Sequence, residues 1–118
     1  SRLNRIPDIR YSGEAAASML RRTLDAFARM DPVAAASIIK DDLGIDDRFR
    51  AVLRQLITFM MEDPRTISAS LDCVWVAKAI ERIGDHAKNV AEHVIFISQG
   101  WDARHQSLED VERAVARA

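Results

Sequence analysis

Proline is the feature that most limits what this chain can form, because it occurs at only three positions and leaves long uninterrupted segments. Pro32 and Pro64 are each preceded by an aspartate, in the matching words MDP at 30–32 and EDP at 62–64. An aspartate side chain caps a helix well, and proline fits the first helical position, where its missing N–H is not needed. Each Asp-Pro motif therefore predicts that one helix ends and another begins there.

The segments between these words carry apolar residues at the steps of three and four that a helix requires. In the segment 13–30 they are Leu20, Thr23, Leu24, Phe27 and Met30. In the segment between the two prolines they are Ile38, Ile45, Phe49, Val52, Leu56, Phe59 and Met60. Gly44 interrupts that second stripe at roughly 1 kcal/mol relative to alanine, so we expect one long helix that can bend there. The third segment runs from Pro64 to Gln99, and Gly100 supplies a left-handed stop.

The expected fold class is all-α, an up-down-up three-helix bundle with long second and third helices. Helices of about 18, 30 and 36 residues extend roughly 27, 45 and 54 Å at 1.5 Å per residue, so parts of the longer two lack a cover. The tail 102–118 has the pattern of a further helix, with Ser107 and Asp110 as a cap and an apolar edge of Leu108, Val111 and Val115. This tail, another subunit or a second half of a longer protein could supply the cover.

Length and charge narrow the class of protein. We expect residues 1–118 to form a single domain, because the chain has enough apolar residues for one core. The formal net charge of −1 provides no excess of cations for phosphates, which argues against direct binding of nucleic acid. No uncharged apolar run approaches the ~18 residues that span a bilayer, so we expect no membrane insertion. The single Cys73 suits a reducing compartment, and we expect a cytoplasmic location.

Two pairs of acidic residues stand one helical turn apart, Glu81 with Asp85 and Asp42 with Asp46. Like charges at this spacing repel by roughly 0.2–0.5 kcal/mol. Antiparallel helices could bring the two pairs together, and a hard cation such as Mg, Mn or Fe would relieve the repulsion. Acid pairs at this spacing are common on helices, however. Spacing alone therefore favours a solvent-exposed face on which neighbouring lysine and arginine side chains pair with the carboxylates.

The third helix divides into two faces at 100° per residue. The expected core face consists of Val76, Ala79, Ile83, Ala87, Val90, Val94 and Ile97. The nearly opposite face, outside the main core, consists of Glu81, Asp85, Asn89 and Glu92. Leu71, Val74 and Phe96 lie on the same outer stripe, so we expect that surface to meet a partner and the chain to self-associate.

Four segments of the sequence closely resemble the C-terminal half of the PhoU family, regulators associated with bacterial phosphate-specific transport. They are LDAFARMD at 24–31, KDDLGID at 40–46, RQLITFMMEDPRTI at 54–67 and AKAIERIGDHAKNVAEHVIFISQG at 77–100. The resemblance covers about residues 20–101. Members of the family have two similar three-helix bundles in tandem, each with E/D-x-x-x-D motifs that bind metal ions, whereas this chain has one.

The resemblance implies a site and a function. Carried over position by position, it assigns metal binding to Asp42, Asp46, Glu81 and Asp85, with the ion left open among divalent or trivalent Mg, Mn or Fe. It implies a regulator of phosphate uptake and phosphate-responsive signalling that contacts a sensor histidine kinase and the ATPase subunit of the phosphate ABC transporter. No group of residues in the sequence marks a nucleophile or general base, so we expect no catalytic residue and no enzyme. Two alternatives are a metal-dependent hydrolase and a metal-free helical protein-interaction module.

The remaining candidate ligands and anchors have simpler interpretations. His86 and His93 share a helical face beside Asn89, and they are interpreted as ordinary helix residues that could join a site only from the side. Trp75 and Trp101 are expected to anchor the packing.

Overall fold

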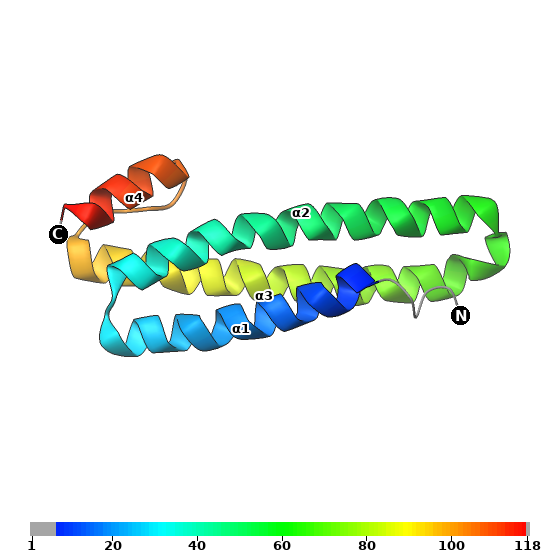
Figure 1. Cartoon of the computed structure of the whole chain (residues 1–118), viewed down its shortest axis with the longest axis horizontal. Helices are drawn as coiled ribbons and strands as arrows, with labels where there is room; N and C mark the ends of the chain where they lie inside the picture. The colour runs from blue at the N-terminus through cyan, green and yellow to red at the C-terminus, as the bar shows by residue number, and fades with distance from the viewer. Residues whose placement is uncertain (1–6, 118) are drawn as a thin grey trace.

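The computed structural model describes residues 7–117, which contain four α-helices, one short 3₁₀ helix and no β-strand. Helices α1 (Pro7–Arg29), α2 (Pro32–Glu62) and α3 (Ile67–Gln99) run up, down and up, and η2 (Pro64–Thr66) joins the last two (Figure 1). Helix α4 (Leu108–Ala116) follows a loop and packs against α2. The predicted all-α, up-down-up bundle is therefore confirmed. Residues 1–6 and Ala118, which the expected single domain also included, lie outside the described residues.

Both Asp-Pro motifs mark helix boundaries as predicted, but the second begins the short η2, and α3 itself starts at Ile67 without a side-chain cap. The Asp31 carboxylate accepts hydrogen bonds from the backbone N–H groups of Val33 and Ala34, both at 3.1 Å, and so caps α2. The Asp63 carboxylate accepts a hydrogen bond from the backbone N–H of Arg65 at 3.1 Å and begins η2. In each case the side chain satisfies N–H groups that have no partner inside the helix.

The lengths of the helices are also close to those predicted. Helix α3 ends at Gly100, whose φ of 68° is the left-handed conformation that glycine adopts without strain. Helix α2 continues through Gly44 as one helix of 31 residues. Helix α1 begins at Pro7, six residues earlier than the predicted segment 13–30. No helix within residues 7–117 has an apolar stretch long enough to cross a bilayer.

The tail forms the further helix that its pattern predicted. The backbone N–H of Asp110 donates to Ser107 Oγ at 3.1 Å, which caps the first turn of α4. Val111 and Val115 are buried in the main core, and Leu108 packs against it. Helix α4 thereby covers the first turns of α2 (Figure 1).

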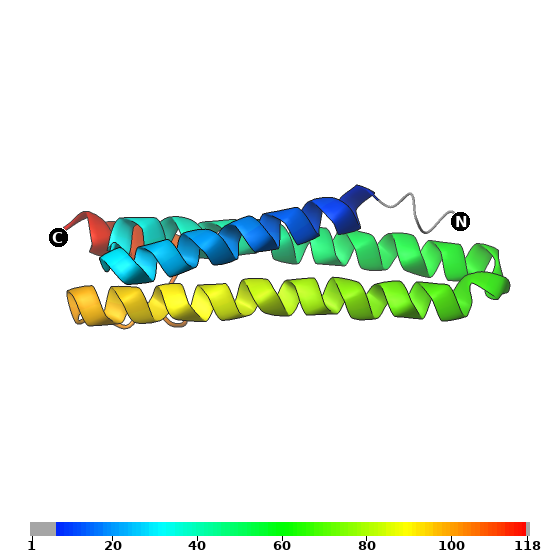
Figure 2. The same cartoon turned by 90° about the horizontal axis from the view of Figure 1, so that it is seen from below.

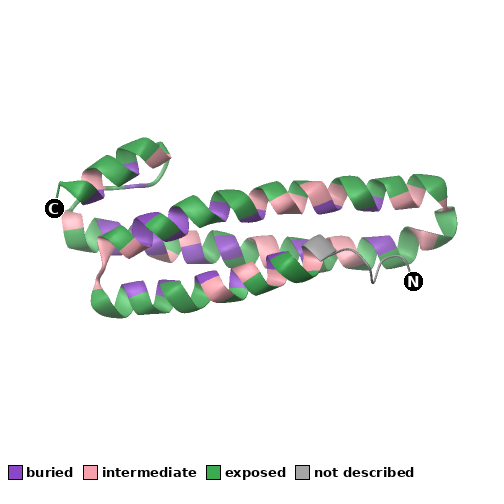
Figure 3. Cartoon of the chain, in the orientation of Figure 1, coloured by how far each residue is buried: buried purple, intermediate pink, exposed green. Residues whose placement is uncertain are grey.

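Buried residues lie on the sides of the three long helices that face one another (Figure 3). The predicted apolar stripe of α2 is confirmed as the face toward the core. Its most deeply buried members, all at most 3% exposed, are Ile38, Ile45, Val52 and Leu56. Phe49 and Phe59 are partly buried beside them.

The predicted stripe of α1 is wrong for its largest side chains. Thr23 is buried, but Leu20, Leu24 and Phe27 are 42%, 62% and 48% exposed. The residues that α1 buries are mostly smaller: Ser12, Ala16, Met19, Thr23 and Ala26. Three helices that pack closely place small side chains at their contacts. A prediction based only on large apolar side chains therefore chose the wrong side of this helix.

The predicted core face of α3 needs the same correction. Ala87 and Val94 are buried as expected, but Val76, Ile83 and Ile97 are 51%, 40% and 60% exposed. Ala79 is exposed too, and Val90 is only half-buried. The face that α3 buries is again mostly small: Ser70, Ala77, Gly84, Ala87, Ala91, Val94 and Ile95. Glu92, placed outside the core by the prediction, is 9% exposed.

Helices α2 and α3 extend beyond the start of α1, as their predicted lengths required (Figures 1 and 2). A smaller apolar cluster that includes Val52, Leu56 and Ala77 holds this end together. Trp75 lies near it but is 74% exposed, so its prediction as a packing anchor is wrong. Trp101 does pack against the main core.

Candidate metal centre

Three of the four predicted metal ligands converge between α2 and α3. Asp42 and Asp46 lie one turn apart on α2, and Asp85 lies on the facing helix α3. One carboxylate oxygen from each of the three lies within 4.8 Å of the other two. Asp42 is 1% exposed, Asp46 is half-buried and Asp85 is exposed, so the group runs from the core to the solvent.

Asp42 owes its position to a glycine on the neighbouring helix. A Cβ atom at Gly84 would lie 2.7 Å from Asp42 Oδ1, closer than these atoms can pack, and in ordinary contact with Ile45 Cγ2 at 3.4 Å. The absence of a side chain at Gly84 therefore makes the space that the carboxylate occupies. This role of Gly84 was not predicted, although a glycine inside a strongly periodic helix, one residue before Asp85, was an available signal.

The buried oxygen of Asp42 is unusual in having no partner. Asp42 Oδ1 accepts no hydrogen bond from any of the described residues, although it is inaccessible to solvent. Leaving a buried polar atom unsatisfied costs about 1–3 kcal/mol, and more for a charged group. Such an atom calls for an explanation, and a bound cation is one that physical chemistry offers.

Burial and mutual repulsion both raise the pKa values of this group. The pKa of Asp42 rises to about 6, first because of burial and then because of the charges of Asp46 and Asp85. The pKa of Asp46 is also raised, again by burial first and then by Asp85 and Glu81. Lys88 opposes both shifts only in part. The cluster thus holds more negative charge than its surroundings balance.

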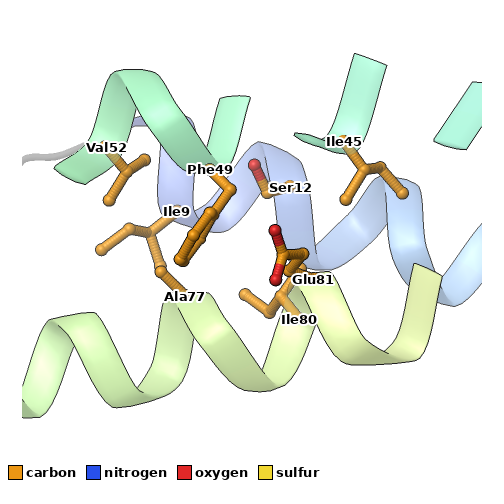
Figure 4. Close-up of a pocket in the computed structure, with 8 residues that line it drawn as sticks. All are labelled: Ile9, Ser12, Ile45, Phe49, Val52, Ala77, Ile80 and Glu81. Carbon is orange, nitrogen blue, oxygen red and sulfur yellow. The ribbon is translucent and has the colours of Figure 1, made fainter. Parts of the chain in front are cut away.

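Glu81, the fourth predicted ligand, stands apart from the other three. Its carboxylate accepts a hydrogen bond from the Lys78 ammonium at 2.6 Å, in a salt bridge between residues three apart on α3. Glu81 also lines a cavity of about 10 Å³ between the three long helices, close to the space of one water. Figure 4 shows its carboxylate among the side chains of that cavity, which include Ser12 and Phe49. Its charge still acts on Asp42 and Asp46, so it lies near the group without belonging to it in this conformation.

The other polar residues of α3 that were candidates for this site are not part of the group. Asn89 and Glu92 line a separate hollow with Arg104 and His105 of the loop before α4. His86 and His93 are both exposed, and neither belongs to the converging group.

The chemistry of the three carboxylates fits a hard cation. Carboxylate oxygens are the ligands that Mg, Mn and Fe ions accept, and a cation would supply the missing partner of the buried Asp42 oxygen. It would also oppose the burial and the mutual repulsion that raise the pKa values of Asp42 and Asp46. Asp42, Asp46 and Asp85 are the residues placed to hold such an ion. Glu81 could join them if its carboxylate left the salt bridge with Lys78 and bound the ion instead.

Fold and site together define a class of protein, a small antiparallel helical bundle whose second and third helices present a cluster of carboxylates. Comparison with known proteins gives the family. Residues 9–94 match the model of the PhoU domain. The chain is 45% identical over 102 residues to the phosphate-specific transport system accessory protein PhoU homolog of Pseudomonas putida, an alignment that covers 86% of this chain and 40% of that protein. It is 39% identical over 104 residues to the accessory protein PhoU of Escherichia coli K12, covering 88% and 43%.

A solved structure agrees with these relatives. The crystal structure of PhoU from Pseudomonas aeruginosa superposes with a TM-score of 0.76 at 44% identity, covering 78% of this chain and 44% of that one. The chain belongs to the PhoU family, as the resemblance of its sequence words predicted. It spans less than half the length of the curated relatives that it matches.

Proposed function

We propose that this chain is an accessory regulator of phosphate uptake and phosphate-responsive signalling, which acts as a metal-binding helical adaptor. In this role Asp42, Asp46 and Asp85 hold a divalent or trivalent ion such as Mg, Mn or Fe, with Glu81 able to join them. The adaptor works in the cytoplasm and contacts a sensor histidine kinase and the ATPase subunit of a phosphate transporter. It is a binding module and performs no turnover.

One observation carries the metal part of the proposal. Three carboxylates from two helices lie within 4.8 Å of one another, and the most buried of their oxygens lacks a hydrogen-bond partner among the described residues. A solvated acidic face would not bury one of its carboxylates against a helix backbone. The regulatory part is supported by the relatives, which are named as accessory proteins of phosphate-specific transport.

The metal part can be tested by thermal unfolding of chelator-treated protein with and without Mg, Mn or Fe. A cation that binds only the folded state should add roughly 2.7 kcal/mol at a hundredfold excess over its dissociation constant, and the melting temperature should rise. Asp85→Asn keeps the shape and removes one charge, so without metal it should be neutral or slightly stabilising. With metal it should be less stable than the parent, which reverses the sign of its effect.

Asp47→Asn provides a matched control for that experiment. Asp47 is exposed on the same helix and pairs with Arg50 at 2.7 Å, outside the converging group. This variant should respond to metal as the parent does. If the parent and Asp85→Asn melt alike in every condition, and neither responds to any of these ions, the carboxylates form a solvated face and bind no metal. Elemental analysis of the purified protein would identify the ion.

The adaptor part needs a separate experiment with purified partners. The cytoplasmic portion of the cognate sensor kinase and the transporter ATPase subunit would each be titrated with the metal-loaded chain and with the chelated chain. We expect saturable binding that weakens when the metal is removed. Absence of binding to both partners, with a folded and metal-loaded chain, would leave the regulatory role unsupported.

The absence of turnover distinguishes this proposal from a metal-dependent hydrolase. We expect the purified chain, supplied with Mg, Mn or Fe, to hydrolyse a phosphate monoester no faster than the metal alone. Hydrolysis that depends on metal and disappears in Asp85→Ala would support the hydrolase instead.

A further inference from the structure

A groove of about 420 Å³ lies between α1 and α2, and the proposed function gives it no role. Ala15 and Gly44 are among its lining residues, so the two helices leave space between their larger side chains. Among the described residues, no atom of another helix would lie within 4 Å of a Cβ atom added at Gly44, and packing therefore does not account for this glycine. Sites for small molecules have volumes of about 300–1,000 Å³, a range that includes this groove.

The groove carries an excess of positive charge. Its described lining has three cationic side chains, Arg22 on α1 with Lys40 and Arg48 on α2, and one carboxylate, that of Asp41. Asp41 accepts a hydrogen bond from Arg22 at 2.6 Å, which joins the two helices. Lys40 and Arg48 form no ion pair with a carboxylate of residues 9–117. Three positive charges less one negative charge leave the lining at +2, whereas the whole chain has a net charge of −1.

A flat cationic surface lies at one end of the groove. The Arg48 guanidinium lies 3.7 Å from the centre of the Tyr11 ring, a cation–π contact that holds the guanidinium in place. Tyr11 is nevertheless 56% exposed. A guanidinium is planar and stacks on aromatic faces, so Arg48 and Tyr11 together offer a surface for a further flat ring.

Two more cations lie toward the other end of the groove. Lys40 precedes Arg48 by eight residues, which is about 12 Å along the axis of α2 at 1.5 Å per residue. Arg22 lies near Lys40 along the groove, because it pairs with Asp41, the next residue of α2. This separation is comparable with the distance from the base to the terminal phosphate of an extended nucleoside di- or triphosphate.

We propose that the α1–α2 groove binds a nucleoside polyphosphate. The base stacks on Arg48 beside Tyr11, and the phosphate groups lie between Lys40 and Arg22. Arginine and lysine bind phosphate groups in proteins through charge-assisted hydrogen bonds. Gly44 lies midway between Lys40 and Arg48 along α2, where a side chain would take up space that the ligand needs. The phosphates neutralise the excess positive charge of the lining.

The lining suits a small anion better than a protein partner. Protein interfaces have a centre of large apolar side chains that the partner buries. In this groove Met19 and Ile45 are already buried by the bundle, and Tyr11 is the one exposed large apolar side chain of the described lining. Charge is therefore the main feature that a ligand can recognise here.

The α1–α2 groove is separate from the candidate metal centre. On α2, Gly44 is two residues from Asp42 and two from Asp46, so it points about 160° away from both, since each residue turns the helix by 100°. The metal centre joins the opposite side of α2 to α3. Nucleotide binding and metal binding can therefore succeed or fail independently.

Isothermal titration calorimetry of the intact chain in chelator, with ATP as the probe, would test the proposal. The chelator keeps the metal centre empty, so that phosphate groups cannot bind through a metal ion. We expect saturable binding of ATP. Adenosine and tripolyphosphate each carry one half of the ligand and should bind at least about tenfold more weakly than ATP. In an NMR titration, ATP should shift the amide signals of residues 11–22 and 40–48.

Three substitutions locate the binding. Lys40→Gln and Arg48→Gln each remove one charge-assisted contact and should weaken ATP binding about tenfold. Gly44→Leu fills the groove and should abolish binding without unfolding, because nothing lies within 4 Å of an added Cβ atom. Arg82→Gln is the matched control, because Arg82 is exposed on α3 outside the groove, and this variant should bind ATP like the parent. Circular dichroism would verify that all four variants stay helical.

Absence of ATP binding to the parent would overturn the proposal. So would an equal loss of affinity in Arg82→Gln and Arg48→Gln, since the binding would then be a nonspecific effect of charge. Tripolyphosphate that binds as tightly as ATP would overturn the assignment of a base to Arg48. A glutamate-rich peptide that binds where ATP does not, and that Gly44→Leu excludes, would assign the groove to an acidic protein segment instead.

Discussion

At the scale of single residues, two glycines on neighbouring helices have opposite roles. Gly84 leaves the space that the buried Asp42 carboxylate fills, since an added Cβ would lie 2.7 Å from Asp42 Oδ1. Gly44, on α2, has no atom within 4 Å of an added Cβ and is exposed. Glycine inside a helix costs about 1 kcal/mol of stability relative to alanine. Only at Gly84 does packing within the chain offer a reason to accept that cost.

Substitution of each glycine by alanine should therefore change stability in opposite directions. Gly44→Ala should stabilise the chain by up to about 1 kcal/mol, because only the helix propensity changes. Gly84→Ala should destabilise it by about 1–3 kcal/mol, because the new methyl group overpacks a closed contact and displaces Asp42. Urea unfolding of the two variants beside the parent measures both. An equal gain in the two variants would show that Asp42 can move aside without cost.

The raised pKa of Asp42 gives chelator-treated protein a particular dependence on pH. The folded-state pKa is about 6 against an ordinary 3.8, so the folded chain binds the proton more tightly than the unfolded chain. The stabilisation is complete below about pH 4 and is lost as the pH rises through 6, by at most roughly 3 kcal/mol from this group. The raised pKa of Asp46 acts in the same direction. Denaturant unfolding from pH 4 to 7 in chelator measures the fall.

The substitution Asp42→Asn isolates the contribution of Asp42 to the pH dependence of stability. The amide keeps the shape of the carboxyl group but does not titrate, so the fall in stability between pH 4 and 7 should be smaller in this variant. The depressed pKa of Asp102, about 2, affects stability only below pH 4 and so does not interfere. Because metal ligands must be ionised, added cation should stabilise the parent more at pH 7 than at pH 5. Parallel curves for parent and variant would exclude Asp42 as the source.

At the scale of elements, the ends of the helices are determined by single side chains. Asp31 caps α2, Gly100 ends α3 and Ser107 caps α4, each through local backbone contacts. The short α4 depends on its cap more than the long helices do, because nine residues make a marginal helix without tertiary packing.

Ser107→Ala should loosen α4 without unfolding the bundle. Loss of the hydrogen bond from the Asp110 N–H to Ser107 Oγ should cost about 1 kcal/mol. Hydrogen exchange should accelerate in residues 108–116 and stay unchanged in the middle of α3. Ser68→Ala, at an exposed position in the first turn of α3, is the control and should leave the exchange of α4 unaltered. Exchange that increases equally in all helices would mean that α4 and the bundle unfold as one unit.

At the scale of the whole molecule, the described residues form an elongated body with extents of 55 × 24 × 16 Å. The long α2–α3 hairpin carries the candidate metal centre. On the outer surface of α3, Leu71 and Phe96 are 49% and 54% exposed, and exposed apolar surface usually marks an interface. The expectation that the chain self-associates therefore stays a prediction, which sedimentation over a range of concentrations checks. A strict monomer at the highest concentration would contradict it.

The sequence by itself determined the helices, their order and most of their ends, because caps, prolines and the left-handed glycine act through neighbours in the chain. Acidic residues one turn apart share a helical face, so the sequence also singled out Asp42, Asp46, Glu81 and Asp85, and the family resemblance assigned them to metal binding. It could not determine which apolar stripe is buried, and it assigned Leu24 and Ile83 to the core. Only the tertiary structure decided that, because the approach of three helices favours small residues at the contacts. The same packing buried Asp42 against Gly84, a relation between helices that no spacing along the chain specifies. The salt bridge of Glu81 with Lys78 is, by contrast, a pair three residues apart on one helix, which spacing does allow for.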